Sequence, residues 1–417
     1  MKNRPAGAVV MRSQGATPRY TLMQSSYWAS YCILLTFSSV YLLSKGFPNA
    51  QIGVILSLAS VISALLQPVV SRIADGLKKI SLYQFSAGLI VVQLAGSILL
   101  GVLPGQVPQA VIYGVLIVVL QLILPLCNAL GMDCLNRGVP LNFGVARGGG
   151  SIAYGVFSSL CGVMVLRFGE QSLPLAMLAI HLVLFLSVAT FRFRTVKQAE
   201  APAEAAQEEK AAPAADQPKG AFLKRYKWFW PLLIGVVLLF LSHNVLNTYA
   251  YQIVQPLGGT SEQMGNMLFI QSIAELPVMF GFFLLLKKAS SRVWVGLSGI
   301  SFFLHALGEW LAPTIGVIYA VQIFEMPGYA LFTIASVYFV NETVAGRDRV
   351  QGQAYIAMAM TIGSVLASFA GGFLLDSLGV RLLLAFATVA GGVGMLLLFP
   401  FAGKKKQAAS EQAAELA

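Results

Sequence analysis

The sequence predicts an all-α integral membrane protein with twelve transmembrane helices in two pseudo-symmetric six-helix bundles. Composition, the spacing of apolar segments and the placement of charges each support this fold class. The chain has 417 residues, of which 57% are hydrophobic and only 11% are charged. Soluble proteins average roughly 25% charged residues, so this chain could not cover a water-facing surface. A bilayer supplies the apolar surroundings that such a composition requires.

Apolar segments long enough to cross a hydrocarbon core of about 30 Å follow one another along the chain. They form two sets, separated by a polar stretch. The first set covers 22–44, 50–74, 82–104, 109–134, 145–167 and 172–191, and the second covers 228–255, 263–286, 292–312, 314–340, 351–375 and 379–402.

The positions of the basic residues predict the orientation. With both termini in the cytoplasm, all but three of the 28 Lys and Arg residues fall on the cytoplasmic side; the exceptions are Lys45, Arg167 and Arg381. This asymmetry follows the positive-inside rule and supports an even number of spans. We therefore expect a multi-pass protein of the cell membrane, and the net charge of +11 does not indicate nucleic acid as a partner. Residues 1–19 are polar and basic, so no signal peptide is expected.

A tract of Ala, Pro, Glu and Lys at residues 198–220 divides the chain. It lacks aromatic and branched apolar residues, so it is expected to be a disordered cytoplasmic linker. The predicted organisation is an N-terminal bundle at 1–192, a linker at 193–226, a C-terminal bundle at 227–403 and a cytoplasmic tail at 404–417.

The two halves share a faint internal repeat. In each half, the second span opens with Gln, an apolar residue and Gly, and a later Pro precedes a Lys-Lys pair at the same interval. Repeats of this kind build a central site between two moving halves in many transporters. The matching residues are Gln51, Gly53, Pro68, Lys78 and Lys79 in the first half, and Gln263, Gly265, Pro277, Lys287 and Lys288 in the second.

Neither an enzyme nor a metal site is predicted. The chain contains no G-x-S-x-G, H-E-x-x-H or cofactor fingerprint, so no cofactor is expected. The four cysteines form no C-x-x-C pair, which argues against zinc and a disulfide framework; they are Cys32, Cys127, Cys134 and Cys161, all within apolar segments.

Ionisable side chains inside predicted spans are costly and indicate functional positions. Glu325 shares a helical face with Gln322 and Tyr329, and it could take up a proton on one side of the membrane and release it on the other. Glu275 shares a face with Gln271 and could bind solute or form an ion pair. The alternative for both acids is a structural hydrogen bond between helices.

Arg147 opens the fifth span and places a charge, a hydroxyl and an aromatic ring on one stripe with Ser151 and Tyr154. A link to Asp133 in the fourth span would neutralise both charges. The alternatives are an arginine that extends to the interface or a pair that acts as a gate.

Two further stripes are polar enough to line a wet cavity, or else to join helices by hydrogen bonds. The first contains His243, Asn247 and Tyr251, and the second contains Gln24, Tyr27 and Tyr31. His305 in the ninth span could titrate near neutrality, and isolated His181 is expected to be structural. Asp75 lies in a predicted cytoplasmic turn with Lys78 and is a candidate gating residue.

The segment QIGVILSLASVISALLQPVVSRIADGLKK resembles the span 2–3 signature of the major facilitator superfamily, and the chain is similar to its lactose-permease-like, oligosaccharide–proton symporter branch. FGVARGGGSIAYG resembles the segment carrying the sugar-binding arginine, which implies that role for Arg147. Tyr154 stands where the family has a sugar-stacking tryptophan. AELPVMF and QIFEMP imply a sugar-binding and coupling role for Glu275 and a proton-carrying role for Glu325.

The chain departs from this branch at several positions. The second sugar-binding acid falls on Ala129, and Asp133 is the nearest acid that could replace it. The coupling arginine is replaced by His305, and the histidine before the proton carrier by Gln322. An asparagine that binds sugar falls on Val278, and the charged pair joining spans 7 and 11 is absent.

The resemblance implies a monomeric, proton-driven symporter of a small polar solute, with a sugar or oligosaccharide first among the substrates. The candidate substrate residues are Arg147, Tyr154, Glu275, Ser151, Asp133, Asn247 and Tyr27; those for proton coupling are Glu325, His305, Gln322 and Glu275. The alternatives are the same fold carrying a nucleoside, an aromatic acid or a drug by symport or antiport, or a sensor that has lost transport.

Overall fold

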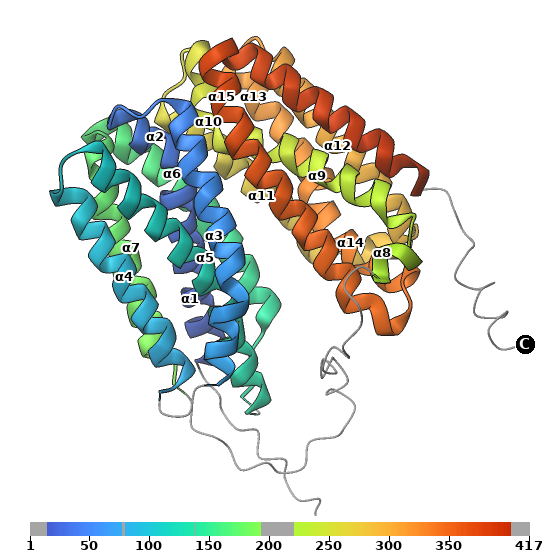
Figure 1. The fold of residues 1–417 in the computed structure, drawn as a ribbon, viewed down its shortest axis with the longest axis horizontal. Coiled ribbons are helices and arrows are strands. Elements are labelled where there is room, and N and C mark those ends of the chain that lie inside the picture. Colours follow the sequence, from blue (N-terminus) through green and yellow to red (C-terminus); the bar gives the residue numbers. More distant parts are fainter. Residues whose placement is uncertain (1–14, 77–79, 138, 193–220, 402–417) are drawn as a thin grey trace, which may run out of the picture.

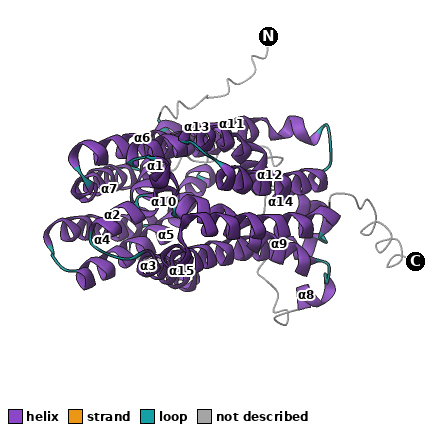
Figure 2. Ribbon diagram, turned by 90° about the horizontal axis from the view of Figure 1, so that it is seen from above, coloured by secondary structure: helices purple, strands orange, loops and turns teal. Residues whose placement is uncertain are grey.

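The computed structural model describes residues 15–76, 80–137, 139–192 and 221–401, and every regular element in these ranges is a helix (Figure 2). Helical residues lie in each of the twelve predicted segments. The first half contains α1 Ala16–Tyr31, a π-helical turn Cys32–Thr36, α2 Ser38–Ser44, α3 Asn49–Asp75, α4 Leu82–Val102, α5 Gln106–Asn136, α6 Phe143–Phe168 and α7 Leu173–Ala189.

The second half begins with a short helix and ends with a very long one. Its elements are α8 Ala221–Arg225, α9 Phe229–Thr248, α10 Ala250–Val254, α11 Ser261–Leu286, α12 Ser291–Leu311, α13 Ile315–Val321, α14 Leu331–Thr343 and α15 Arg349–Leu398. The long helix α15 is broken at Gly379, where φ is 78°, a backbone conformation that glycine adopts without steric penalty. Between α13 and α14, the 3-10 turn Gln322–Glu325 and the π-helical turn Met326–Ala330 interrupt the helix around Pro327.

The described helices are those of a multi-pass membrane protein. Eight are long and apolar enough to cross a bilayer, and nine if the pair at 16–36 and 38–44, bent by 44°, is one span. Their outer faces carry exposed apolar side chains such as Leu65, Val107 and Leu175. Lipid is the solvent that favours such a surface.

The helices form two groups that meet at one end and separate toward the other (Figure 1). At the closed end α3 of the first half meets α15, whereas α11 of the second half packs on α6 from this end, at Gly265, as far as Gly148 near the start of α6. A Cβ on Gly53 would lie 2.1 Å from the backbone oxygen of Ser368, and one on Gly265 would lie 2.2 Å from that of Ser158. Only glycine permits these approaches, so the repeated glycine has the same use in both halves.

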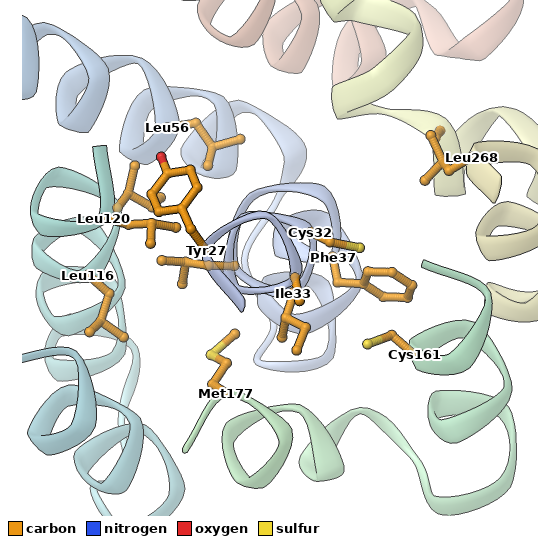
Figure 3. Close-up of a cluster of buried hydrophobic side chains, with 14 of the residues drawn as sticks. Tyr27, Cys32, Ile33, Phe37, Leu56, Leu116, Leu120, Cys161, Met177 and Leu268 are labelled. Atoms are coloured by element: carbon orange, nitrogen blue, oxygen red, sulfur yellow. The ribbon is translucent and has the colours of Figure 1, made fainter. Parts of the chain in front are cut away.

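The core of the first half surrounds the first span. Figure 3 shows Ile33, Cys32 and Phe37 in the middle of a cluster that Met177 and Cys161 approach from other helices. All four cysteines are buried and unpaired, as expected from their apolar surroundings.

Part of the predicted linker range is helical. Residues 193–220 lie outside the described part, but α8 forms within the predicted range of 193–226 and buries Phe222. Arg225 Nη1 donates to Asp348 Oδ2, with 2.5 Å between the two atoms, and Tyr226 Oη donates to the same oxygen at 3.1 Å. The Asp348 carboxylate raises the pKa of Arg225. This segment is therefore anchored to the second half. The sequence analysis assigned it to the linker because the preceding tract has few apolar residues.

Candidate functional site

A polar cavity of about 440 Å³ lies between the two halves. Side chains from α1, α6, α9 and α11, which belong to different halves of the sequence, line it together. Its polar and aromatic lining includes Tyr27, Trp28, Tyr31, Thr36, Gln121, Arg147, Ser151, Tyr154, His243, Asn244, Asn247, Thr248, Gln271, Ser272, Glu275 and Tyr329.

The wall from the first half presents an arginine surrounded by aromatic rings. The guanidinium carbon of Arg147 lies 4.3 Å from the ring centroid of Trp28, and its Nη1 donates to Ser151 Oγ at 3.2 Å. Tyr154 Oη lies 2.9 Å from Thr36 Oγ1. Among the described residues Arg147 forms no ion pair, and its side chain lines the cavity.

The wall from the second half presents an acid and amides. Glu275 lines the cavity and has neither a hydrogen bond nor an ion pair to another described residue. One turn earlier on α11, Gln271 Nε2 donates to Asn247 Oδ1 at 3.1 Å and to Glu325 Oε1 at 2.9 Å. Gln271 therefore connects the cavity surface to a carboxyl group that lies behind it.

Glu325 is buried between two histidines. Its Oε1 lies 3.2 Å from His243 Nδ1, and its Oε2 lies 3.1 Å from His305 Nδ1. The His243 ring stacks on Tyr329, with 4.8 Å between centroids. The 3-10 and π-helical turns around Pro327 position Glu325 and Tyr329, because proline cannot continue a regular α-helix. Local departures of this kind are common at functional sites.

The sequence analysis missed Glu309, which completes this group. Its Oε1 lies 3.3 Å from His305 Nε2 and accepts a hydrogen bond from Gln322 Nε2 at 2.8 Å. Gln322, which shares a predicted helical face with Glu325, therefore bonds to Glu309. Glu309 follows His305 by four residues within a predicted span, and this spacing was the signal that could have identified it.

The expected link between Arg147 and Asp133 is wrong. Asp133 Oδ2 pairs instead with Arg137 Nε at 2.8 Å, and about half of each side chain is exposed. Asp133 lies outside the central cavity and lines a separate pocket of about 200 Å³ with Phe191. The end of α5 holds Arg137 one turn away, and this local pairing replaces the one across helices.

Several other expected side chains lie apart from the cavity. Gln24 is buried and donates to Asn128 Oδ1 at 3.0 Å, so it joins helices and does not face the cavity. Tyr251 is not part of the cavity lining, whereas Tyr27 and Asn247 are. His181 Nδ1 lies 2.9 Å from Ser97 Oγ. Asp75 is the last residue of α3, and Lys78 lies outside the described residues, so their gating role stays a prediction.

Comparison with known proteins identifies the family. A model of the MFS_1 like family matches residues 21–386. The chain belongs to this family. As an MFS_1 like protein it is a membrane transporter of a small-molecule solute, and not an enzyme.

Two curated relatives support this assignment. Maltose permease of Geobacillus stearothermophilus is 25% identical over 95% of this chain and 98% of its own length. The uncharacterized transporter YwbF of Bacillus subtilis (strain 168) is 24% identical over 86% of each chain.

Solved structures share the fold of this MFS_1 like protein. The nucleoside transporter NupG has a TM-score of 0.76 and 15% identity, covering 94% of this chain and 100% of its own. An auto inhibited POT family peptide transporter has a TM-score of 0.69 and 10% identity, covering 94% of this chain and 97% of its own.

Proposed function

We propose that the protein is a proton-coupled symporter that carries a sugar or oligosaccharide by alternating access. The observation that carries this proposal is a buried carboxyl group, Glu325, held between two histidines directly behind a polar cavity. Intramembrane acids that are paired with histidine and shielded from bulk water are suited to binding and releasing protons.

The proposed topology has twelve spans, with both termini and the linker in the cytoplasm of the cell membrane. In this topology α15 crosses twice and reverses at Gly379, and the helix around Pro327 is one interrupted span. The bundles at 1–192 and 227–403 would then be the two moving units. Since α3 and α11 begin on the outer side in this topology, the closed end faces outward and the end at which the two groups separate faces the cytoplasm (Figure 1).

The cavity suits a solute with several hydroxyl groups. Arg147 can donate two hydrogen bonds in a fixed plane to solute oxygens, and Glu275 on the opposite wall can accept hydrogen bonds from solute hydroxyl groups. Tyr154 and Trp28 also line the cavity and are aromatic rings of the kind that a sugar ring stacks on, although Arg147 already covers one face of Trp28. The similarity to maltose permease favours a sugar of this class.

A nucleoside is the second candidate, supported by the rings of Tyr27, Trp28, Tyr31 and Tyr154 around the cavity. A base stacks on such rings as readily as a sugar does. The same lining would also accommodate an aromatic acid or a drug, carried by symport or export.

Gln271 offers a route for coupling. Its side-chain amide is hydrogen-bonded to both Asn247 and Glu325. A solute that competes for the Gln271 amide or binds Glu275 would change the surroundings of Glu325, and hence its proton affinity. The proton gradient, and no cofactor, would then drive accumulation, in a protein that we expect to work as a monomer.

Uptake into proteoliposomes tests the proposal. The purified chain is supplied with labelled maltose, uridine and an aromatic acid under an imposed proton gradient, a sodium gradient or neither. We expect proton-driven accumulation of maltose. Glu325→Gln should abolish accumulation while counterflow exchange continues, and Glu170→Gln, at a partly exposed acid outside the site, should behave as wild type. Undiminished proton-driven uptake by Glu325→Gln would refute the coupling assignment.

A further inference from the structure

Two buried carboxyl groups face the same imidazole ring. His305 presents Nδ1 to Glu325 at 3.1 Å and Nε2 to Glu309 at 3.3 Å. All three side chains are at most 3% exposed. We propose that Glu309 is a second proton-carrying group, and that His305 passes protons between Glu309 and Glu325. This inference rests on the proposed function of Glu325.

Charge balance supports a shared proton. With both carboxyls ionised and His305 neutral, the buried trio would carry two negative charges, and unpaired buried charge is very costly. The groups that interact with the trio from other elements are His243 of α9, Glu275 of α11 and Tyr329 of the π-helical turn, and none of these is a permanent cation. The nearby cation Arg147 interacts with Glu275 and Tyr329, on the cavity side. The second half of α15, which packs on α12 through Gly391, has no ionisable residue after Arg381. A proton held within the trio is therefore the available compensation.

Unsatisfied polar atoms gather at the Glu309 end of the trio. Glu309 Oε2 and Gln322 Oε1 are buried without a hydrogen-bond partner among the described residues, and His305 Nε2 approaches Glu309 without hydrogen-bond geometry. Native proteins leave few such atoms unpaired. If Glu309 is protonated, its carboxyl group supplies a hydrogen-bond donor for the acceptors at this end of the trio.

The position of Glu309 gives the relay a direction. Glu325 lies behind the cavity-lining residues His243 and Gln271, whereas Glu309 is one helical turn beyond His305, about 6 Å along the axis. Two residues later, Leu311 ends α12 and is 64% exposed. In the proposed topology this end of α12 is the outer one. Protons would thus reach Glu325 through the second half and bypass the solute cavity, which is closed on that side.

The transfer conserves protons and charge. Glu309 begins protonated, and neutral His305 carries its proton on Nδ1, facing the Glu325 carboxylate. The Glu309 proton moves to Nε2 while the Nδ1 proton moves to Glu325 Oε2. Glu309 is then ionised, His305 is neutral as the other tautomer, and Glu325 is protonated. To restore the starting state, Glu325 releases its proton toward the cytoplasm, His305 returns to the tautomer with its proton on Nδ1, and Glu309 takes up one proton from outside.

Infrared spectroscopy of the purified full-length protein tests the relay without requiring a substrate. A protonated buried carboxyl group has a distinct carbonyl absorption, which is followed as a function of pH in wild type, Glu309→Gln, Glu325→Gln and His305→Gln. We expect a titrating band that Glu309→Gln removes, and a Glu325 band whose midpoint moves by about one pH unit or more in that variant, as interacting sites require. His305→Gln should retain both bands.

Transport of labelled maltose separates the relay from the underlying function. Glu309→Gln should slow proton-driven uptake about tenfold or more and spare counterflow, which also verifies folding; Glu170→Gln is the matched control. The relay is overturned if the Glu309 band is absent or constant at every pH, or if its removal leaves Glu325 unaffected. Failure of the proposed function gives a different result: in that case Glu325→Gln leaves proton-driven uptake intact.

Discussion

Asp376 joins the two halves at the closed end, and its removal should open that end. Its Oδ1 accepts from Asn49 N at 3.2 Å and Asn49 Nδ2 at 2.7 Å, and its Oδ2 accepts from Ala50 N at 2.7 Å. Asn49 begins α3, so a carboxylate from the second half caps a helix of the first. The cap exists only in the closed arrangement, because separation of the halves breaks these hydrogen bonds. Asp376→Ala therefore destabilises the closed arrangement and leaves the open one unchanged.

The size of the effect follows from these contacts. Loss of a helix cap costs about 0.5–2 kcal/mol, and a carboxylate at a helix N-terminus contributes about 0.3–1 kcal/mol when exposed. We therefore expect Asp376→Ala to destabilise the closed end by about 1–2 kcal/mol, which multiplies the ratio of open to closed molecules about 5- to 30-fold. Asp376→Asn retains an acceptor oxygen and should lose less.

Spin labels on the two halves can measure this shift. Val107→Cys and Thr314→Cys place labels at exposed positions of the first and second half, and the four native cysteines are buried. Asp376→Ala should increase the long-distance population between the labels. Ser377→Ala, at an exposed neighbour whose hydroxyl donates to the backbone of its own helix, is the control. An unchanged distance distribution in Asp376→Ala would refute a stabilising role for this cap.

Three further substitutions test other parts of the structure. Gly265→Ala should destabilise the closed arrangement by about 1–3 kcal/mol, because its Cβ would lie 2.2 Å from a backbone oxygen of the other half. The control is Gly281→Ala on the same helix, where a Cβ meets no atom within 4 Å. It should behave as wild type in the same spin-label measurement. Asp133→Asn should transport maltose at the wild-type rate, since its exposed ion pair is worth at most about 1 kcal/mol. A large loss of transport would show that Asp133 does take part in substrate binding. Phe222→Ala should lower the free energy of unfolding by about 3–5 kcal/mol, measured by thermal unfolding in detergent, and an unchanged midpoint would show that α8 does not anchor the second half.

Much of the cavity could be predicted because helical periodicity is local. The stripe of Arg147, Ser151 and Tyr154 follows from 3.6 residues per turn, and these side chains do line the cavity. Pairings across helices could not be predicted in this way. A link between Asp133 and Arg147 of the next span was considered, but Asp133 pairs with Arg137 at the end of its own helix. At this exposed end the two charges can pair without losing their contact with solvent.

Glu325, the proposed proton carrier, shows the same division. Glu325 stands out in the sequence because an acid within an apolar segment is costly. Its neighbours His243, Gln271 and His305 come from three other helices, and no sequence spacing relates them. Glu309 was overlooked because it lies near the end of a predicted span, where an acid alone suggests exposure; the structure buries it against His305 and Gln322.

By itself, the sequence determined that this chain is a membrane protein, because low charge and long apolar segments require a lipid environment. The polar tract between the apolar segments divided them into two sets. It also determined which side chains share a helical face. Only the tertiary structure decided which faces meet: the repeated glycines at contacts between the halves, the anchored α8, and the chain from Glu309 through His305 to Glu325. Such contacts join residues far apart in sequence, and their energy depends on burial and distance, which exist only after the helices pack.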